Sequence, residues 1–242
     1  MEIGFNVAYL VAIWTLVVRM YRRRDQVAAA DRGVAEALWW AFALLALGDT
    51  GHVGFRVWAY ALGGLEDGLD SRAFGVPLVG AGALATAVTV TLFYVLMLVA
   101  WHRRFSKPYG VIGGVLFAAA AVRLLVMLFP QNQWAEVVPP HDWSLYRNLP
   151  LVVQGLGVAF LILRDARRSG DHLFRWIGIW ILVSFAFYAP VILFVQEVPA
   201  VGMLMIPKTL AYLAVAWLVY RDLFARGAGQ PEVVAGATRS VG

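Results

Sequence analysis

The chain has 242 residues, of which 61% are hydrophobic and only 14% are charged, and its mean hydropathy is +0.72. A soluble domain carries about 25% charged residues, so the composition excludes that class and predicts a single-domain, multi-pass protein of the cell membrane. The formal net charge of +5 does not indicate nucleic-acid binding, because the basic residues gather between apolar segments, as membrane topology requires. Without cysteine, disulfides and thiolate chemistry are also excluded.

Seven apolar segments are long enough to cross a bilayer, since a helical span needs about 20 residues. None alternates with period two, so strands are not expected. The sequence therefore predicts an all-α bundle of seven transmembrane helices over residues 1–226, followed by a disordered tail over the Gly/Ala-rich residues 227–242. The spans are expected at about 3–20, 34–62, 76–101, 110–129, 148–163, 173–195 and 201–220.

The positions of lysine and arginine predict the orientation. Fifteen of the 20 follow the first, third, fifth and seventh spans: Arg19, Arg22, Arg23, Arg24, Arg32, Arg103, Arg104, Lys107, Arg164, Arg167, Arg168, Arg175, Arg221, Arg226 and Arg239. Cytoplasmic loops carry such an excess, so we expect the N-terminus outside and the C-terminus in the cytoplasm. These loops have no phosphate-binding glycine loop and no histidine pair, so no site is expected on the cytoplasmic side.

The second predicted span contains three ionisable residues close together in a largely apolar helix. Asp49, His52 and Arg56 follow one another at i, i+3 and i+7, which places them within about 60° on one helix face. An acid or arginine at a helix centre costs roughly 2.5–3.5 kcal/mol to insert. This face must therefore look into a protein interior or a watery cavity and not into lipid.

Further cations are expected near this face, in the outer half of the bundle. Arg123, Arg147 and Lys208 lie toward the outer ends of their spans. With Arg56 they give four positive charges against the one negative charge of Asp49, an excess of three. A carboxylate, phosphate or sulfate would balance it, and arginine binds such groups bidentately. Alternatively, Arg56 and Arg147 reach the outer headgroups, and Asp49 pairs with Lys208 or Arg123 in the core.

Neutral polar side chains are expected at the same depth in the membrane as these cations. They are Gln131, Asn132, Asn148, Gln154 and Tyr188. Pro190 and Pro207 predict bends in the sixth and seventh spans, and a freed carbonyl in a membrane needs a partner or a cavity. The sequence thus predicts an outward-facing pocket for a small anionic or amphiphilic ligand, in a receptor or a transporter. The expected ligand-binding residues are Arg56, Arg123, Gln131, Asn132, Arg147, Asn148, Gln154, Tyr188 and Lys208.

A membrane-embedded enzyme is the alternative interpretation. Asp49 and His52 are close enough in sequence to hydrogen-bond and could act as acid and base on a lipid-like or isoprenoid substrate. A metal site would need three ligands, and the further candidates His141 and Asp142 lie in a loop, so no metal and no cofactor is expected. Beyond membrane lipids and the ligand, no partner is predicted, and the ligand's identity and the oligomeric state stay open.

Two resemblances accompany this interpretation. A single lysine, Lys208, within the seventh of seven spans is similar to the Schiff-base lysine of retinal-binding rhodopsins, which implies chromophore binding there, although the third span lacks a counterion and Asp49 would have to supply it. Over nearly the whole chain, the sequence resembles an uncharacterised family of bacterial seven-span membrane proteins. This second resemblance implies a fold and no activity. The motifs that carry it are Gly48-Asp49…His52…Arg56, Phe129-Pro130-Gln131-Asn132…Trp134, Tyr146-Arg147-Asn148-Leu149-Pro150 and Met203-Leu204-Met205-Ile206-Pro207-Lys208.

Overall fold

A computed structural model describes residues 2–61, 72–73, 76–134, 136 and 140–225, and these residues are almost entirely helical. The α-helices are α1 (Glu2–Arg22), α2 (Arg32–Ala61), α3 (Leu78–Phe105), α4 (Gly110–Met127), α5 (His141–Ser169), α6 (His172–Phe194) and α7 (Met205–Val219). Short 3₁₀ helices occupy Arg24–Gln26, Ala29–Asp31, Pro130–Asn132 and Pro199–Leu204, and a π-helical turn, Tyr220–Ala225, follows α7. The all-α prediction is confirmed, and the tail predicted at 227–242 lies outside the described residues.

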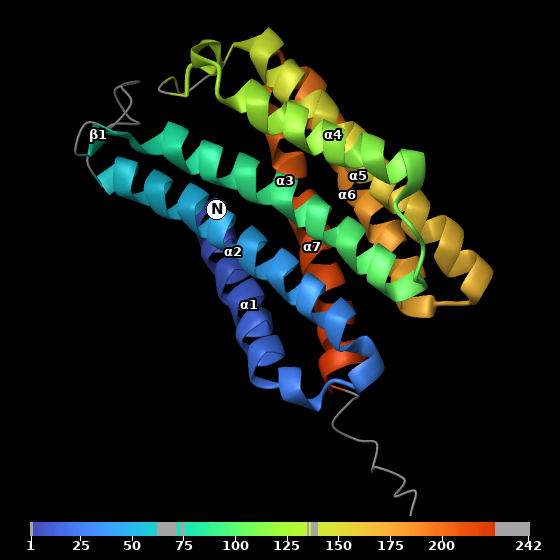
Figure 1. Cartoon of the computed structure of the whole chain (residues 1–242). Coiled ribbons are helices and arrows are strands. Elements are labelled where there is room, and N and C mark those ends of the chain that lie inside the picture. The colour runs from blue at the N-terminus through green and yellow to red at the C-terminus, as the bar shows by residue number, and fades with distance from the viewer. Residues whose placement is uncertain (1, 62–71, 74–75, 135, 137–139, 226–242) are drawn as a thin grey trace, which may run out of the picture.

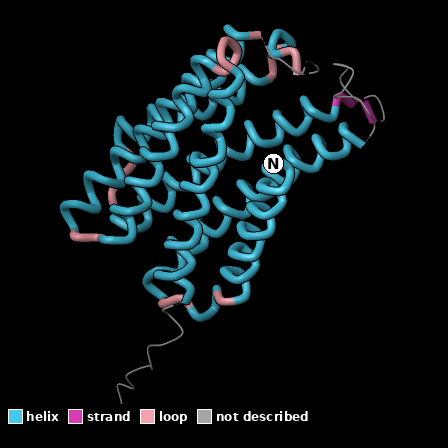
Figure 2. The backbone as a smooth tube through the Cα atoms, turned by 180° about the vertical axis from the view of Figure 1, so that it is seen from behind, coloured by secondary structure: helices cyan, strands magenta, loops and turns pink. Residues whose placement is uncertain are grey.

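One small departure from the helical prediction lies between α2 and α3. The strands β1 (Arg72–Ala73) and β2 (Val76–Pro77) form a two-residue antiparallel pair, with Arg72 opposite Pro77 and Ala73 opposite Val76. Figure 2 shows this pair in magenta at the tip of the α2–α3 hairpin, and the other described segments are helices in cyan and loops in pink. Two-residue strands are too short for a period-two pattern, so no sequence pattern indicates them.

Six of the described helical segments are long and apolar enough to cross a membrane. They correspond to α1, α3, α4, α5, α6 and the segment Pro199–Ala225 that contains α7. The chain is therefore a multi-pass α-helical membrane protein. The 30-residue α2, which carries Asp49, His52 and Arg56, has the length to cross but is not among the six.

The helices are arranged in a ring that follows the chain order (Figure 1). Each helix packs against the next, and α7 closes the ring because it packs against both α6 and α1. At its centre lie aromatic rings in edge-to-face contact: the centroids of Phe93 and Tyr94 are 5.1 Å apart, and those of Phe93 and Tyr212 are 5.4 Å apart. Such edge-to-face contacts contribute about 0.5–1.5 kcal/mol each beyond their buried area.

The seventh predicted span, 201–220, does not begin with an α-helix. Residues 199–204 form a 3₁₀ helix, and α7 starts at Met205. Pro207 therefore lies in the first turn of α7, where main-chain N–H groups make no hydrogen bond within the helix. A proline there breaks no helical hydrogen bond, so the bend predicted at Pro207 is not needed. Pro190, by contrast, lies inside α6.

The two ends of the ring differ in composition. The last turns of α1, α3 and α5 meet at one end and carry Arg19, Arg22, Arg103, Arg104, Arg167 and Arg168. We call this the basic end. The opposite end, here the polar end, is formed by the C-terminal halves of α2, α4 and α6 and the N-terminal halves of α3, α5 and α7, where most of the predicted site residues lie.

Candidate functional site

The part of α2 around Asp49 lies in close contact with α3. A Cβ atom added at Gly48 would be 1.8 Å from the Thr89 hydroxyl oxygen, and one added at Gly82 would be 3.0 Å from the carbonyl oxygen of Gly51. The Thr86 hydroxyl donates a hydrogen bond of 3.0 Å to the carbonyl oxygen of Gly48. Small residues let membrane helices approach closely, so these glycines position α2 against α3. The sequence interpretation missed this role, although the spacing of Gly48, Gly51 and Gly82 could have indicated it.

The carboxylate of Asp49 is held by the first helix. Its Oδ2 accepts a 2.7 Å hydrogen bond from the Tyr9 hydroxyl. Among the described residues, Asp49 forms no ion pair within 4.0 Å, and so neither of the predicted pairs with Lys208 or Arg123. His52 does not share a hydrogen bond with Asp49 either: its Nδ1 is buried and has no partner. The acid and the imidazole are near in sequence but act separately in this structure.

Arg123 is buried at the centre of the polar end, with only 2% of its surface exposed. Its Nε donates a 2.8 Å hydrogen bond to the main-chain oxygen of Arg147, and its NH1 donates one of 2.8 Å to the hydroxyl of Thr91. Both partners are neutral. The positive charge of Arg123 is thus hydrogen-bonded, but no ion pair with an acid of the described residues balances it.

Arg147 and Lys208 lie over aromatic rings. The guanidinium carbon of Arg147 is 4.7 Å from the ring centroid of Trp134. Lys208 Nζ is 4.2 Å from the centroid of Tyr188 and 5.9 Å from that of Tyr212. Cation–π contacts contribute about 0.5–2 kcal/mol but do not neutralise charge. Within the described ranges neither cation has a carboxylate oxygen within 4.0 Å.

Neutral polar groups connect these cations. Gln154 Nε2 donates to the main-chain oxygen of Thr91 over 3.2 Å, and the Tyr188 hydroxyl donates to Asn148 Oδ1 over 3.0 Å. The hydroxyls of Tyr94 and Tyr212 are 2.7 Å apart. Through these contacts six of the predicted residues come together from four helices, and we call them the polar cluster: Arg123, Arg147, Asn148, Gln154, Tyr188 and Lys208.

Two buried polar atoms on α5 have no hydrogen-bond partner. They are Arg147 NH1 and Gln154 Oε1. Gln154 is only 1% exposed. Leaving a buried polar atom unpaired costs about 1–3 kcal/mol, so each is a place where a ligand or water could bond.

Within the described residues, the other predicted ligand-binding residues share no hydrogen bond with the polar cluster. Arg56 is exposed on α2, and Gln131 is exposed in the turn after α4. Asn132 is fully buried, and its amide nitrogen donates to the main-chain oxygens of Val126 and Phe129 over 2.6 and 3.0 Å. These bonds close the C-terminal end of α4, which is a structural task.

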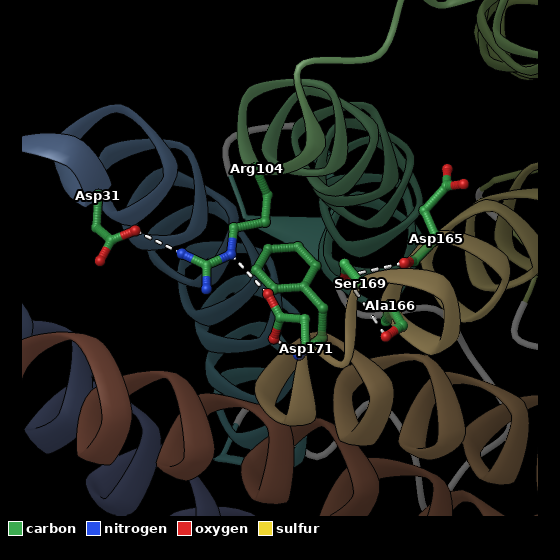
Figure 3. Close-up of polar contacts among 7 residues, drawn as sticks. Asp31, Arg104, Asp165, Ala166, Ser169 and Asp171 are labelled. Atoms are coloured by element: carbon green, nitrogen blue, oxygen red, sulfur yellow. Dashed lines mark hydrogen bonds and ion pairs between the residues drawn. The ribbon is translucent and has the colours of Figure 1, made fainter.

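The basic end contains a second polar site that the sequence did not predict (Figure 3). Arg104 lies between two acids: its Nε donates to Asp171 over 2.6 Å and its NH1 to Asp31 over 2.5 Å. Asp171 also accepts a 3.0 Å bond from the main-chain nitrogen of Phe174, which caps α6. The three side chains border a cavity of about 880 Å³. No sequence signal could have paired Arg104 with acids 73 and 67 positions away.

Other cations at the basic end also have acidic partners. Arg164 pairs with Asp165 at 2.7 Å, and Arg221 pairs with Asp222 at 2.7 Å. The buried Asp165 accepts a further 3.0 Å bond from the indole of Trp101. In the part of the chain that the structure describes, every ion pair lies at this end.

Metal ligands do not gather at either end of the described structure, where no three His, Asp or Glu side chains are grouped so as to hold an ion. No protein-family model, curated protein or solved structure matches the chain. A functional assignment therefore depends on the geometry and charge of the two ends.

Proposed function

We propose that this protein crosses the membrane seven times and binds a small anionic or amphiphilic ligand at its polar end, as a receptor or transporter does. One observation carries the proposal: Arg123, Arg147 and Lys208 converge there, and within the described residues none has a carboxylate within 4.0 Å.

The chain path supports seven crossings. Both α1 and α3 run toward the basic end, where their last turns carry arginine. The chain must return from the end of α1 to the start of α3, and α2 is the helix that makes this return, packed along both neighbours. If α1 and α3 cross the bilayer, α2 crosses as well. With the basic end in the cytoplasm, the N-terminus and the polar cluster face outward.

Charge balance supports an anionic ligand. Burying a cation costs several kcal/mol unless an opposite charge offsets the lost hydration. Asp49 does not offset these cations by contact, because its carboxylate accepts a hydrogen bond from Tyr9 and forms no ion pair within 4.0 Å among the described residues. A ligand carboxylate or phosphate would supply the missing negative charge and would accept hydrogen bonds from Arg147 NH1, which has no partner.

The apolar core beneath the cluster favours binding from one side. Val158, Ile162, Ile177 and Ile181 lie toward the basic end on α5 and α6, and each is at most 1% exposed. These side chains give an ion no polar path to the other end. A receptor-like binding site fits this arrangement better than a channel.

The test uses the full chain in an uncharged detergent. Dodecanoate serves as an anionic amphiphile, and dodecanol serves as its neutral control with the same chain length. Dodecanoate should raise the unfolding temperature more than dodecanol does, since a ligand at 100 times its Kd stabilises by about 2.7 kcal/mol. Arg147→Met or Lys208→Met should remove most of the difference. Asp49→Asn should enlarge it, because it removes a negative charge and keeps an acceptor for Tyr9.

Arg175→Met is the matched control, because Arg175 is an exposed cation at the basic end. It should leave the response to dodecanoate unchanged. Equal stabilisation by dodecanol, or an undiminished dodecanoate response in both cluster variants, would contradict an anion site at the polar end.

A further inference from the structure

A groove of about 510 Å³ lies between α5 and α6 and extends along α5 to the basic end. Its walls include Leu156, Phe160 and Leu182, whose side chains are 40%, 54% and 41% exposed. Arginines line its other part, at positions 164, 167 and 168 of α5. The groove therefore combines an apolar part with a cationic part along one helix.

The floor of the groove depends on a close approach of the two helices. Leu163 is only 7% exposed and lines the groove from α5. A Cβ atom added at Gly178 of α6 would be 2.6 Å from Leu163 Cγ. Because Gly178 has no side chain, Leu163 can lie against the backbone of α6.

The three arginines of the groove differ in charge balance. Arg164 is neutralised by Asp165 through two hydrogen bonds of 3.0 and 2.7 Å. Arg167 and Arg168 are exposed, and across the described residues neither forms an ion pair. Two positive charges at the end of the groove thus lack an acidic partner.

The dimensions of the groove match one leaflet of a bilayer. Leu156 and Arg168 are twelve residues apart on α5, which corresponds to about 18 Å at 1.5 Å per residue. Half of a hydrocarbon core about 30 Å thick is about 15 Å. With the apolar wall in the hydrocarbon, Arg167 and Arg168 lie at the level of the lipid phosphates.

We infer that this groove binds one anionic phospholipid from the leaflet at the basic end. An acyl chain lies along Leu156, Phe160 and Leu182, and the phosphate accepts hydrogen bonds from Arg167 and Arg168. Arginine binds phosphate oxygens bidentately, and basic residues at a membrane surface attract anionic lipids. A free phosphate would leave the apolar wall unused, and a zwitterionic lipid would leave the two charges unbalanced.

Native mass spectrometry of the full chain tests this assignment. The protein in detergent is mixed with equal amounts of phosphatidylglycerol and deuterated phosphatidylcholine that have the same acyl chains. The unmodified protein should retain phosphatidylglycerol preferentially. Arg167→Gln with Arg168→Gln should reduce that preference by about fivefold for each arginine removed. Leu182→Trp should reduce retention with all the arginines intact, because the larger ring fills the groove.

Arg19→Gln with Arg22→Gln is the control pair. It removes the same charge from exposed positions of α1 at the same end and should leave the preference intact. Three results would overturn the assignment: an equal loss in this control, equal retention of the two lipids by the unmodified protein, or displacement of phosphatidylglycerol by soluble glycerol phosphate.

Discussion

The two ends of the bundle hold their cations in different ways. At the basic end Arg104 lies between Asp31 and Asp171, within 2.5 and 2.6 Å. At the polar end Arg123 donates to a threonine hydroxyl and a main-chain oxygen, while Arg147 and Lys208 lie over aromatic rings. Cations lie over aromatic rings at both ends, but among the described residues ion pairs occur only at the basic end.

This difference separates structural charge from charge that is available to a ligand. An ion pair offsets the hydration that its members lose, so a paired arginine stabilises the folded state only as long as its acid remains. A buried arginine with neutral partners keeps its unbalanced charge, which an anion can still use. The same residue type thus predicts opposite mutational behaviour at the two ends.

The largest effect is expected from Arg104→Met at the basic end. The change leaves two carboxylates without their cation, and Asp171 has a side chain only 8% exposed. Breaking such a pair should lower the free energy of unfolding by about 3 kcal/mol, measured by denaturation in detergent. Arg103→Met is the control, since its partner Glu36 is 63% exposed; it should cost less than about 1 kcal/mol. Equal losses in the two variants would show that Arg104 does not join the helices.

An intermediate effect is expected where the polar end is held by close helix packing. Gly48→Ala places a Cβ atom 1.8 Å from the Thr89 hydroxyl oxygen, so α2 and α3 must separate. The expected loss is about 1–3 kcal/mol in the same denaturation measurement. Gly54 lies on the same helix with nothing within 4 Å of an added Cβ, so Gly54→Ala should be neutral or slightly stabilising. Two variants of equal stability would mean that the α2–α3 contact does not require glycine.

The helices of this fold could be predicted from hydropathy, because a backbone in lipid must satisfy its own hydrogen bonds. The excess of positive charge at the polar end could be predicted too, because it follows from the positions of lysine, arginine and acidic residues along the spans. The partner of each charge could not, because it depends on how far each helix is rotated toward its neighbours. Asp49 was expected beside Lys208, Arg123 or His52, and it accepts its hydrogen bond from Tyr9 on α1. The pairing of Arg104 with Asp31 and Asp171 escaped prediction for the same reason.

The smallest change in stability is expected from Arg123→Met, although Arg123 is the most buried cation of the polar cluster. The substitution removes two hydrogen bonds to neutral groups, and it also removes an unbalanced charge from the interior. Thr91 keeps its 2.8 Å hydrogen bond to the main-chain oxygen of Ala87. The two effects nearly cancel, so the free energy of unfolding without ligand should change by less than about 1 kcal/mol.

Thr91→Val provides the contrast that makes this result decisive. It keeps the charge of Arg123 and removes the acceptor of its NH1, so it should cost about 1–3 kcal/mol, more than the loss of the arginine itself. Dodecanoate should stabilise the Arg123→Met protein less than the unmodified protein, because part of the charge that holds the anion is gone. If Arg123→Met instead lowered stability by as much as Arg104→Met, both cations would be structural. The cations of the polar end would then stabilise the fold, as those of the basic end do, and would differ from them only in their hydrogen-bond partners.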